Sequence, residues 1–365
     1  MTEVEADTRR GYTPAASPAL VDFFSGCGGT SAGFRAAGMR IIAGVDNDLS
    51  SGATFAKNFP EAKFIGEDIR KLNPAKLQPI IDSAGTSPLV FSACAPCQPF
   101  SKQRRGPKTA DDRVPLLLEF YAFVKRYLPV CIFIENVPGM QRGADSEFPF
   151  QEFQRKIKRL KYYTSAAVVS SASYGVPQQR QRLVALASRL GPIELPPATH
   201  GPGTENPRYS TVREWIGDLP PIAAGEAHPF IPNHRASNLS DANLRRIRAT
   251  PEGGGREDWP VELLPRCHSN GYDGHTDVYG RMSWDQLATG LTTRCISYSN
   301  GRFGHPSQDR AISVREAASI QTFPRDFVFT GYWDSMSRQI GNAVPVLMAR
   351  HFGAQIISHI ARYGC

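Results

Sequence analysis

Residues 20–29 are Leu20-Val21-Asp22-Phe23-Phe24-Ser25-Gly26-Cys27-Gly28-Gly29. The first half is a short apolar run, of the length of one buried β-strand. The second half is a glycine-rich turn, and glycine lets a backbone bend sharply and approach a ligand closely. A helix-like stretch follows at residues 30–37. A strand, a glycine-rich turn and a helix in this order predict the first unit of an open α/β sheet, with a ligand at the carboxyl end of the strand.

The same alternation of apolar runs and helix-like stretches continues to residue 187. It predicts a parallel, doubly wound sheet. The expected strands are 39–45, 63–65, 89–93, 130–134, 165–170 and 183–187, and the expected helices are 46–59, 116–127 and 150–160. From about residue 190 to 280, prolines and glycines interrupt the chain, which predicts a separate loop-rich region. Order is expected again at 312–322 and in a C-terminal helix at 346–363.

The length and composition indicate a globular protein with two domains. The chain has 365 residues, more than one hydrophobic core usually serves. Residues 1–18 have no apolar centre and are expected to be a flexible lead-in, not a signal peptide. No apolar run approaches the roughly 20 residues that a membrane-spanning helix needs. The seven scattered cysteines are an odd number, so reduced thiols in the cytoplasm are expected.

The positive charge is unevenly distributed. The net charge is +8, which favours a polyanionic partner. Residues 101–190 contain 16 basic and 7 acidic side chains, whereas residues 191–280 contain 8 basic and 12 acidic ones. A basic stretch suits either a solvated surface or contact with phosphates. The excess begins directly after residue 100, and the charge count alone leaves both interpretations open.

Two acidic residues follow the next two predicted strands. Asp46 closes the strand at 39–45, where an acid can bind ribose hydroxyls. Asp68 follows the strand at 63–65, where its carboxylate can accept a hydrogen bond from an adenine amino group. Each Asp alone also suits an ordinary loop or helix cap, and the glycines alone suit a tight turn. Together, three such features at successive strand ends favour a nucleoside-type cofactor.

A cysteine between two prolines follows the strand at 89–93, in Ala95-Pro96-Cys97-Gln98-Pro99-Phe100-Ser101. The prolines favour a rigid, exposed position, which suits a nucleophile. A free cysteine is more often a small buried hydrophobe, however. Cys94-Ala95-Pro96-Cys97 is also a C-x-x-C pattern, typical of redox or zinc sites, although no second pair or paired histidines complete a zinc site. From the residues alone, all three roles for Cys97 stay open.

The Pro-Cys-Gln motif at 96–98 resembles the catalytic motif of the cytosine-5 DNA methyltransferases. Further motifs of that family follow in family order between residue 21 and about residue 355, interrupted at 191–280. Each motif alone is weak, but the ordered set is specific. The matching segments are 23–29, Glu135-Asn136-Val137, Gln178-Gln179-Arg180-Gln181-Arg182, Arg315-Glu316-Ala317-Ala318 with Gln321-Thr322-Phe323-Pro324, and Gln339-Ile340-Gly341-Asn342-Ala343-Val344-Pro345.

The resemblance implies methyl transfer from S-adenosylmethionine to carbon 5 of cytosine in DNA. Carbon 5 is a poor nucleophile, so the Cys97 thiolate would first add to ring carbon 6. Glu135 ends a predicted buried strand, and burial favours the protonated form that can donate to ring nitrogen 3. The alternative for Glu135 is a strand-end acid paired with an arginine.

Two arginines, Arg180 and Arg182, alternate on one predicted strand and are expected to face the same side. Both are candidates for favouring the thiolate of Cys97. Arg182 is the preferred contact to the ring carbonyl oxygen, where it would also brace Glu135. A surface basic pair beside a strand is the alternative. The four predicted catalytic residues are Cys97, Glu135, Arg180 and Arg182.

The resemblance also implies the cofactor site and the domain organisation. S-adenosylmethionine is the expected cofactor, and no metal is expected. A Rossmann-like catalytic domain is predicted at 19–190 plus 335–365, with a smaller, loop-rich target-recognition domain at 191–334 and DNA between them. The predicted cofactor-binding residues are Phe23, Ser25, Gly26, Gly28, Asp46, Asp68, Ile69, Pro96, Asn342 and Val344.

The implied partner is double-stranded DNA with a specific target sequence. The target cytosine must leave the base stack before it can react. The basic loop at 101–113 is predicted to close over it, with DNA contacts from Ser101, Lys102, Gln103, Arg104 and Arg105. A monomer in the bacterial cytoplasm is expected, and a paired restriction endonuclease is a candidate functional partner.

Three other hypotheses compete with this one. A related branch methylates transfer RNA, but the insert at 191–280 favours DNA. A catalytically inactive relative would be expected to lack the nucleophile or the acid, and both Cys97 and Glu135 are present. A C-x-x-C oxidoreductase would leave Glu135 and the arginine pair without a function.

Overall fold

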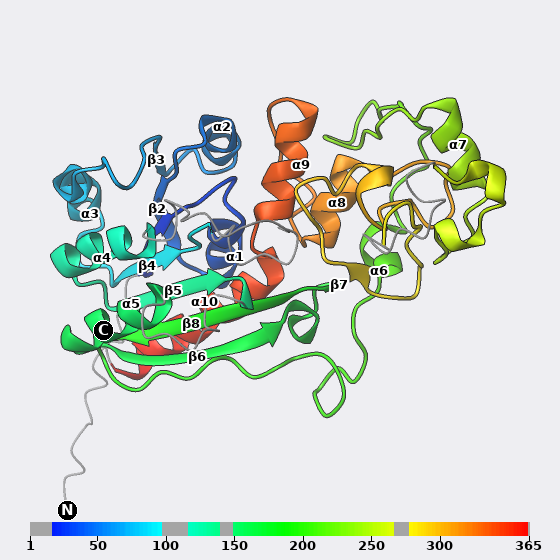
Figure 1. The fold of residues 1–365 in the computed structure, drawn as a ribbon. Helices are drawn as coiled ribbons and strands as arrows, with labels where there is room; N and C mark the ends of the chain where they lie inside the picture. Colours follow the sequence, from blue (N-terminus) through cyan, green and yellow to red (C-terminus); the bar gives the residue numbers. More distant parts are fainter. Residues whose placement is uncertain (1–16, 97–115, 139–148, 266–276, 364–365) are drawn as a thin grey trace, which may run out of the picture.

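The computed structural model describes residues 17–96, 116–138, 149–265 and 277–363. Within these residues the central element is a seven-stranded sheet in the order β3-β2-β1-β4-β5-β8-β6 (Figure 1). The strand order reverses beside β1, which is where open α/β sheets bind their ligands. The strands are β1 (Ala19–Phe23), β2 (Arg40–Val45), β3 (Lys63–Ile65), β4 (Leu89–Ala93), β5 (Cys131–Asn136), β6 (Tyr163–Ser170) and β8 (Gln181–Ser188).

The sheet is mixed, so the prediction of a wholly parallel sheet is wrong for one strand. β3, β2, β1, β4 and β5 are parallel, but β8 is antiparallel to both β5 and β6. A parallel return needs a crossover of a dozen or more residues. The segment between β6 and β8 holds only the short helix η4 (Ser171–Tyr174) and the strand β7 (Gln178–Gln179). The reversal brings the start of β8 to the carboxyl end of β5, where Asn136 pairs with Leu183.

Helices cover both faces of the sheet. On one face Phe23 of β1 contacts Phe120 and Phe123, with ring centroids 4.9 and 5.0 Å away. On the other face the first and last helices pack so closely that a Cβ on Gly33 would lie 2.5 Å from the Ala349 Cβ. The helices around the sheet are α1 (Gly29–Ala37), α2 (Leu49–Asn58), η1 (Pro74–Leu77), α3 (Gln78–Asp82), α4 (Leu116–Tyr127), α5 (Pro149–Arg159) and α10 (Val346–Arg362).

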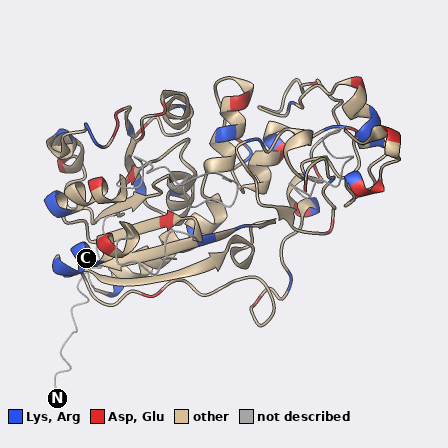
Figure 2. Cartoon of the chain, viewed as in Figure 1, with Lys and Arg blue, Asp and Glu red and all other residues tan. Residues whose placement is uncertain are grey.

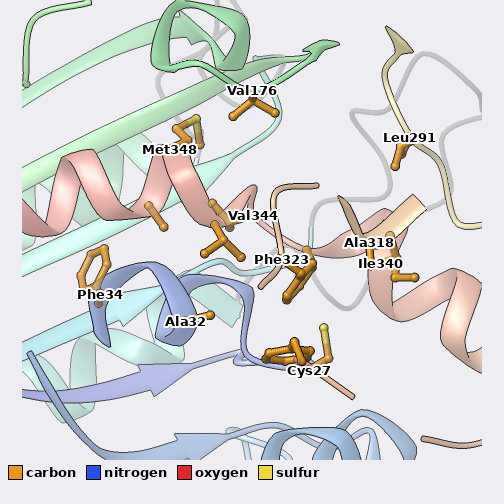
Figure 3. Packing of buried hydrophobic residues seen from close by; sticks show 14 of the residues in the cluster. Cys27, Ala32, Phe34, Val176, Leu291, Ala318, Phe323, Ile340, Val344 and Met348 are labelled. Atoms are coloured by element: carbon orange, nitrogen blue, oxygen red, sulfur yellow. The ribbon is translucent and has the colours of Figure 1, made fainter. Parts of the chain in front are cut away.

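Most of the residues between β8 and α10 form a region with little sheet, to the right in Figure 1, which the chain reaches by a segment that runs beneath β6. β7 and β9 (Ala288–Thr289) pair in parallel where this region meets the large sheet. One buried apolar cluster continues across the junction and includes Phe34, Val176, Leu291 and Val344 (Figure 3). The other elements are α6 (Val212–Ile216), α7 (Asp241–Arg248), η5 (Arg256–Asp258), η6 (Val261–Leu263), η8 (Tyr298–Asn300), α8 (Val314–Ile320) and α9 (Trp333–Asn342). None of the helices in the described parts of the chain has the length and apolar character needed to cross a membrane.

A buried ion pair stabilises the loop-rich region. Arg310 is fully buried and donates to both carboxylate oxygens of Glu316 at 2.7 Å. Glu316 also accepts from the backbone of Ser313 at 2.6 Å, which completes the N-terminal cap of α8. Although burial alone would raise the pKa of Glu316, its contacts with Arg310 keep that pKa below the ordinary value. The pair therefore fixes the start of α8 to the loop before it.

Glu316→Gln should lower the free energy of unfolding by about 3 kcal/mol, because it leaves the Arg310 cation buried without a counter-charge. Urea denaturation would measure the change. Asp285→Asn is the matched control: Asp285 pairs with Arg213 at 2.7 Å, but both side chains are largely exposed. The control should unfold like the wild type, since water solvates the arginine that is left. Equal denaturation midpoints for wild type and Glu316→Gln would contradict the assignment.

Candidate active site

The glycine-rich turn after β1 is held open beside the sheet. Phe24, Gly26 and Gly28 have positive φ angles of 57°, 50° and 97°. A Cβ on Gly28 would lie 2.5 Å from the Phe59 ring, so this position needs glycine. A Cβ on Gly26 would have no atom within 4 Å. The turn is therefore packed against the protein at Gly28 and borders free space at Gly26.

Asp46 connects this turn to the end of β2. Its carboxylate accepts hydrogen bonds from the backbone of Gly26 and of Asp48, both at 2.8 Å. Burial raises its pKa above the ordinary value, and the two backbone bonds counteract part of that rise. A carboxylate has lone pairs beyond these two bonds. Asp46 can thus hold the turn and still accept from a ligand hydroxyl.

Asp68 lies after β3 and is paired with a neighbour. Arg70 Nε lies 3.0 and 3.1 Å from the two carboxylate oxygens, and Arg70 Nη2 lies 2.5 Å from one of them. These hydrogen bonds lower the pKa of Asp68. Ile69 is buried and Pro96 is exposed. The sequence placed Asp68 correctly at a strand end, but did not predict its arginine partner.

A buried acid of β1, Asp22, was not singled out in the sequence interpretation. It lies inside β1, is 1% exposed, and accepts from Ser31 at 2.7 Å and from Ser92 at 2.6 Å. Burial raises its pKa to about 6. An acid within the apolar run 20–24 was the signal that could have identified it. Asp22 connects β1, β4 and α1 directly beneath the glycine-rich turn.

The turn offers what the polar parts of S-adenosylmethionine require. The Ser25 hydroxyl is buried and has no hydrogen-bond partner in the described part of the chain. It lies beside Gly44 of β2, where an added Cβ would be 2.9 Å from the hydroxyl oxygen, and Asp46 follows two residues later. An unpartnered hydroxyl, an acid and an open glycine backbone suit the amino-acid and ribose groups of that cofactor. The residues present fit it.

Two predicted cofactor residues belong to the segment before α10. Asn342 is exposed at the end of α9, whereas the Val344 side chain is only 3% exposed and packs in the core. The Val344 carbonyl lies 2.6 Å from where a Cβ on Gly29 would be. The structure thus brings this segment against the turn after β1, with Val344 presenting its backbone there.

Glu135 and Arg182 form an ion pair at the carboxyl end of β5. Glu135 is 7% exposed, and its Oε1 lies 2.6 Å from Arg182 Nε. The two groups are poorly aligned, so Oε1 has no hydrogen bond in regular geometry among the described residues. Arg182 also donates to the Gln181 carbonyl at 2.7 Å. A buried acid beside a cation, with hydrogen-bonding capacity left over, is prepared to meet a polar ligand.

The neighbouring Asn136 fixes the chain that leads to the predicted nucleophile. Its side-chain amide donates to the Ala95 carbonyl at 2.9 Å. Cys94 lies 3.5 Å from the Thr30 hydroxyl, and burial, followed by the charge of Glu135, raises its pKa well above the ordinary value. A raised pKa disfavours the thiolate that nucleophilic or redox chemistry would need. Cys97 and the predicted DNA contacts lie outside the described residues; these contacts are Ser101, Lys102, Gln103, Arg104 and Arg105.

Arg180 and Arg182 have different partners. Arg180 is buried just before β8 and donates to the carbonyls of Leu291 at 2.8 Å and Gly341 at 3.1 Å. Burial, and then the charge of Arg182, lower the pKa of Arg180 to about 9. Its guanidinium is thus committed to backbone carbonyls, while that of Arg182 contacts Glu135.

A buried pair of amides accompanies Arg180. Gln178 donates to Gln321 at 2.6 Å, and Gln321 donates to the carbonyls of Ile340 at 2.7 Å and Ala343 at 3.0 Å. The Gln178 side chain also accepts from the Leu291 backbone at 3.2 Å. Segments far apart in sequence therefore meet through side chains of the motifs at 178–182 and 321–324. Among the described residues no cluster of three or more His, Cys, Asp or Glu suits a metal ion.

The sequence profile of the C-5 cytosine-specific DNA methylases matches residues 19–358. The chain belongs to this family. It is a DNA cytosine-5-methyltransferase, an enzyme that methylates carbon 5 of cytosine in DNA. S-adenosylmethionine is the methyl donor that this family uses. The reaction expected from the Pro-Cys-Gln resemblance, methylation of carbon 5 of cytosine in DNA, is confirmed.

Similar bacterial proteins are type II methyltransferases. The type II methylase M.HgiDII of Herpetosiphon aurantiacus is 41% identical over 337 residues, which cover 91% of this chain and 93% of that protein. M1.HphI of Haemophilus parahaemolyticus is 33% identical over 340 residues, covering 92% and 86%. Both relatives are named as type II enzymes.

Solved structures support the fold. A prophage-encoded Escherichia coli protein described as a DNA modification methyltransferase has a TM-score of 0.71 at 21% identity, covering 94% of this chain and all (100%) of that one. A methyltransferase of Entamoeba histolytica has a TM-score of 0.62 at 15% identity, with 94% and 99% covered. The predicted fold class, a methyltransferase domain with a doubly wound α/β sheet, is confirmed, with β8 as the antiparallel exception.

Proposed function

We propose that this methylase acts on a cytosine that has rotated out of a specific double-stranded sequence, through a covalent bond from Cys97 to ring carbon 6. The pair formed by Glu135 and Arg182 supports this most directly. A flipped base presents nitrogen 3 and the carbonyl oxygen on neighbouring positions of one edge. An acid and an arginine 2.6 Å apart, at the ligand-binding edge of the sheet, suit these two atoms.

The proposed reaction has three steps, which are addition to the ring, methyl transfer and elimination. The Cys97 thiolate forms a bond to carbon 6, and Glu135, whose carboxylate takes up a proton from solvent before the base enters, donates that proton to nitrogen 3. The electron pair of the ring then becomes available at carbon 5. When bound, S-adenosylmethionine would supply a methyl group for carbon 5, and its positively charged sulfur would keep the bonding electrons. Loss of the carbon 5 proton to a base then allows the thiolate to leave, and the proton on nitrogen 3 returns to Glu135.

We assign Arg180 a positioning role instead of contact with the base. Its contacts with Leu291 and Gly341 leave only Nε without a partner in the described structure. Through these contacts Arg180 holds the start of β8, and so Arg182, relative to two distant segments. Arg182 remains the proposed contact for the ring carbonyl oxygen.

The cofactor would be held at the ends of β1 to β4. We propose that Ser25, Gly26 and Gly28 contact its amino-acid part and that Asp46 accepts from the ribose. Asp68 would accept a hydrogen bond from the adenine amino group while its carboxylate stays bound to Arg70. The remaining proposed contacts are Phe23, Ile69, Pro96, Asn342 and the Val344 backbone.

The division into domains at 19–190 plus 335–365 and at 191–334 stays a proposal, as does a monomeric state. DNA contact by the loop at 101–113 is likewise proposed. The relatives are named as type II methyltransferases, which supports the further proposal that a restriction endonuclease with the same target sequence accompanies this enzyme.

Incubation with S-adenosylmethionine and a library of duplexes containing 5-fluorocytosine tests the proposal. Fluorine at carbon 5 cannot leave as a proton, so the covalent bond to Cys97 should persist. We expect a denaturation-resistant protein–DNA species, with the label mapped to the peptide that contains Cys97. The trapped duplexes should share the target sequence. Methylation of ordinary duplexes without any trapping of the fluorinated ones would overturn the covalent mechanism.

A further inference from the structure

Six of the 16 basic side chains in residues 101–190 lie on the side of the sheet away from the active site. α4 ends with Lys125 and Arg126, and α5 ends with Lys158 and Arg159, followed by Lys161. Each helix leads into a parallel strand, β5 or β6, so its last turn lies at the amino edge of the sheet. Figure 2 shows the blue ends of α4 and α5 together at the left of the view.

Other basic side chains join them from neighbouring elements. Arg189 follows the antiparallel β8 and is bound through its backbone to the Val130 carbonyl at 3.0 Å. Arg362 ends α10, where His359 contacts Ser188 at 2.8 Å. We call this surface the basic edge, and its members are Lys125, Arg126, Lys158, Arg159, Lys161, Arg189 and Arg362, all of them exposed.

The charges of the basic edge are not neutralised by carboxylates within the described structure. None of the ion pairs between described residues involves any of the seven members of the basic edge. The acids of the two helices, Glu119 and Glu152, lie in their first turns, away from this edge. The nearest acid in sequence to the amino edge of β4 is Asp82, which accepts from Gln78.

Helix electrostatics explain only part of this cluster. Lysine and arginine in a last turn interact favourably with the helix dipole, by about 0.3–1 kcal/mol each. That accounts for the residues at the ends of α4, α5 and α10. It does not account for Lys161 or Arg189, which lie beyond the helices. A surface shared by helix ends and strand ends, with one sign of charge, suits a polyanion.

The basic edge cannot serve the duplex in the active site directly. Glu135 lies at the carboxyl end of β5, and the basic edge lies at its amino end. Five residue steps of strand separate Cys131 from Asn136, about 16 Å at 3.3 Å per residue. The helix ends extend the separation further, and the sheet itself lies between the two places.

We propose that the basic edge is a second, sequence-independent binding surface for the phosphate backbone of duplex DNA. It would bind a DNA segment other than the one whose cytosine is being methylated. Lysine and arginine contacts to phosphate position a duplex without reading its bases. The enzyme could then hold two segments of one long DNA molecule, and transfer from one to the other without full release.

A two-duplex capture experiment tests this proposal. The full-length enzyme is loaded on a bead-bound random duplex, and a fluorescent 30-base-pair duplex is then added. The test variant is Lys125→Glu/Lys161→Glu, and the matched control is Lys57→Glu/Lys63→Glu, two exposed lysines elsewhere. Both variants change the net charge equally. Melting temperatures check that each variant is folded.

We expect the wild type and the control to capture the second duplex, and the test variant to lose at least about three-quarters of that capture. The salt dependence of second-duplex binding should weaken by about two units of logarithmic slope, one for each lost phosphate contact. Binding of the first duplex and methyl-transfer rate should be unchanged, which separates this result from a failure of the proposed mechanism. Equal capture by both variants, or none by the wild type, would overturn the proposal. Preferential capture of polyglutamate over duplex at equal charge would instead assign the surface to an acidic protein.

Discussion

Cys97→Ser should bind duplex DNA and S-adenosylmethionine with unchanged affinity, yet lose methyl transfer by at least about 10⁴-fold. A serine hydroxyl is almost fully protonated at neutral pH, so it cannot add to carbon 6 as a thiolate can. Single-turnover transfer of a tritiated methyl group measures the loss. Trapping of 5-fluorocytosine duplexes should disappear in parallel.

Cys94→Ser is the control, three positions away in the same segment. Cys94 is a half-buried thiol of raised pKa that contacts Thr30, and serine can keep that contact. We expect its turnover to stay within about tenfold of the wild type, the cost of one altered buried contact. If Cys94→Ser were as inactive as Cys97→Ser, a C-x-x-C mechanism would have to be considered again. Normal turnover by Cys97→Ser would refute the nucleophile assignment.

The local features of the site were predictable because they depend on short stretches of sequence. An apolar run predicts a strand, and the residue that closes it lies at an edge of the sheet. This logic placed Asp46, Asp68 and Glu135 at strand ends, where the structure has them. It also allowed the contact between Arg182 and Glu135. For Asp46 the sequence predicted the place at the end of a strand. The hydrogen bond that its carboxylate accepts from Gly26, 20 residues away, is seen only in the structure.

Long-range partners were not predictable from the sequence. Arg180 donates to Leu291, which is 111 positions away, and no periodic pattern encodes such a contact. The antiparallel direction of β8 has a similar origin, because it depends on the absence of a crossover helix and not on the strand itself. Asp22 was missed for a third reason: an acid inside an apolar run contradicts the pattern that defines the strand.

The basic stretch shows how a linear count can mislead. Charges at 101–190 were attributed to the loop after Cys97, which lies outside the described residues. Lys125, Lys158 and Lys161 belong to that count, yet helices carry them to the opposite edge of the sheet. A charge sum over sequence mixes surfaces that the α/β alternation separates, because each helix returns the chain to the other edge. The two edges therefore call for separate tests.

Glu135→Gln should slow methyl transfer by about 10²- to 10⁴-fold, the usual contribution of a positioned acid. Glutamine has nearly the same shape and can still donate a hydrogen bond, but it cannot transfer a proton to nitrogen 3. Addition of Cys97 would then leave negative charge on the ring. The rate of 5-fluorocytosine adduct formation should fall as much as the rate of methyl transfer. Glu152→Gln, on the surface of α5, is the control and should be unaffected.

Arg182 determines whether the acid works alone. Because Arg182 Nε lies 2.6 Å from Glu135, the two side chains should act on the base as one unit. The double variant Glu135→Gln/Arg182→Met should therefore be about as slow as the slower single variant, and not as slow as the product of both effects. Fully multiplicative losses would mean that the two groups act at different steps. If adduct formation stayed fast while methyl transfer slowed, Glu135 would act after the attack of Cys97, and the proposed order of proton and thiolate addition would be wrong.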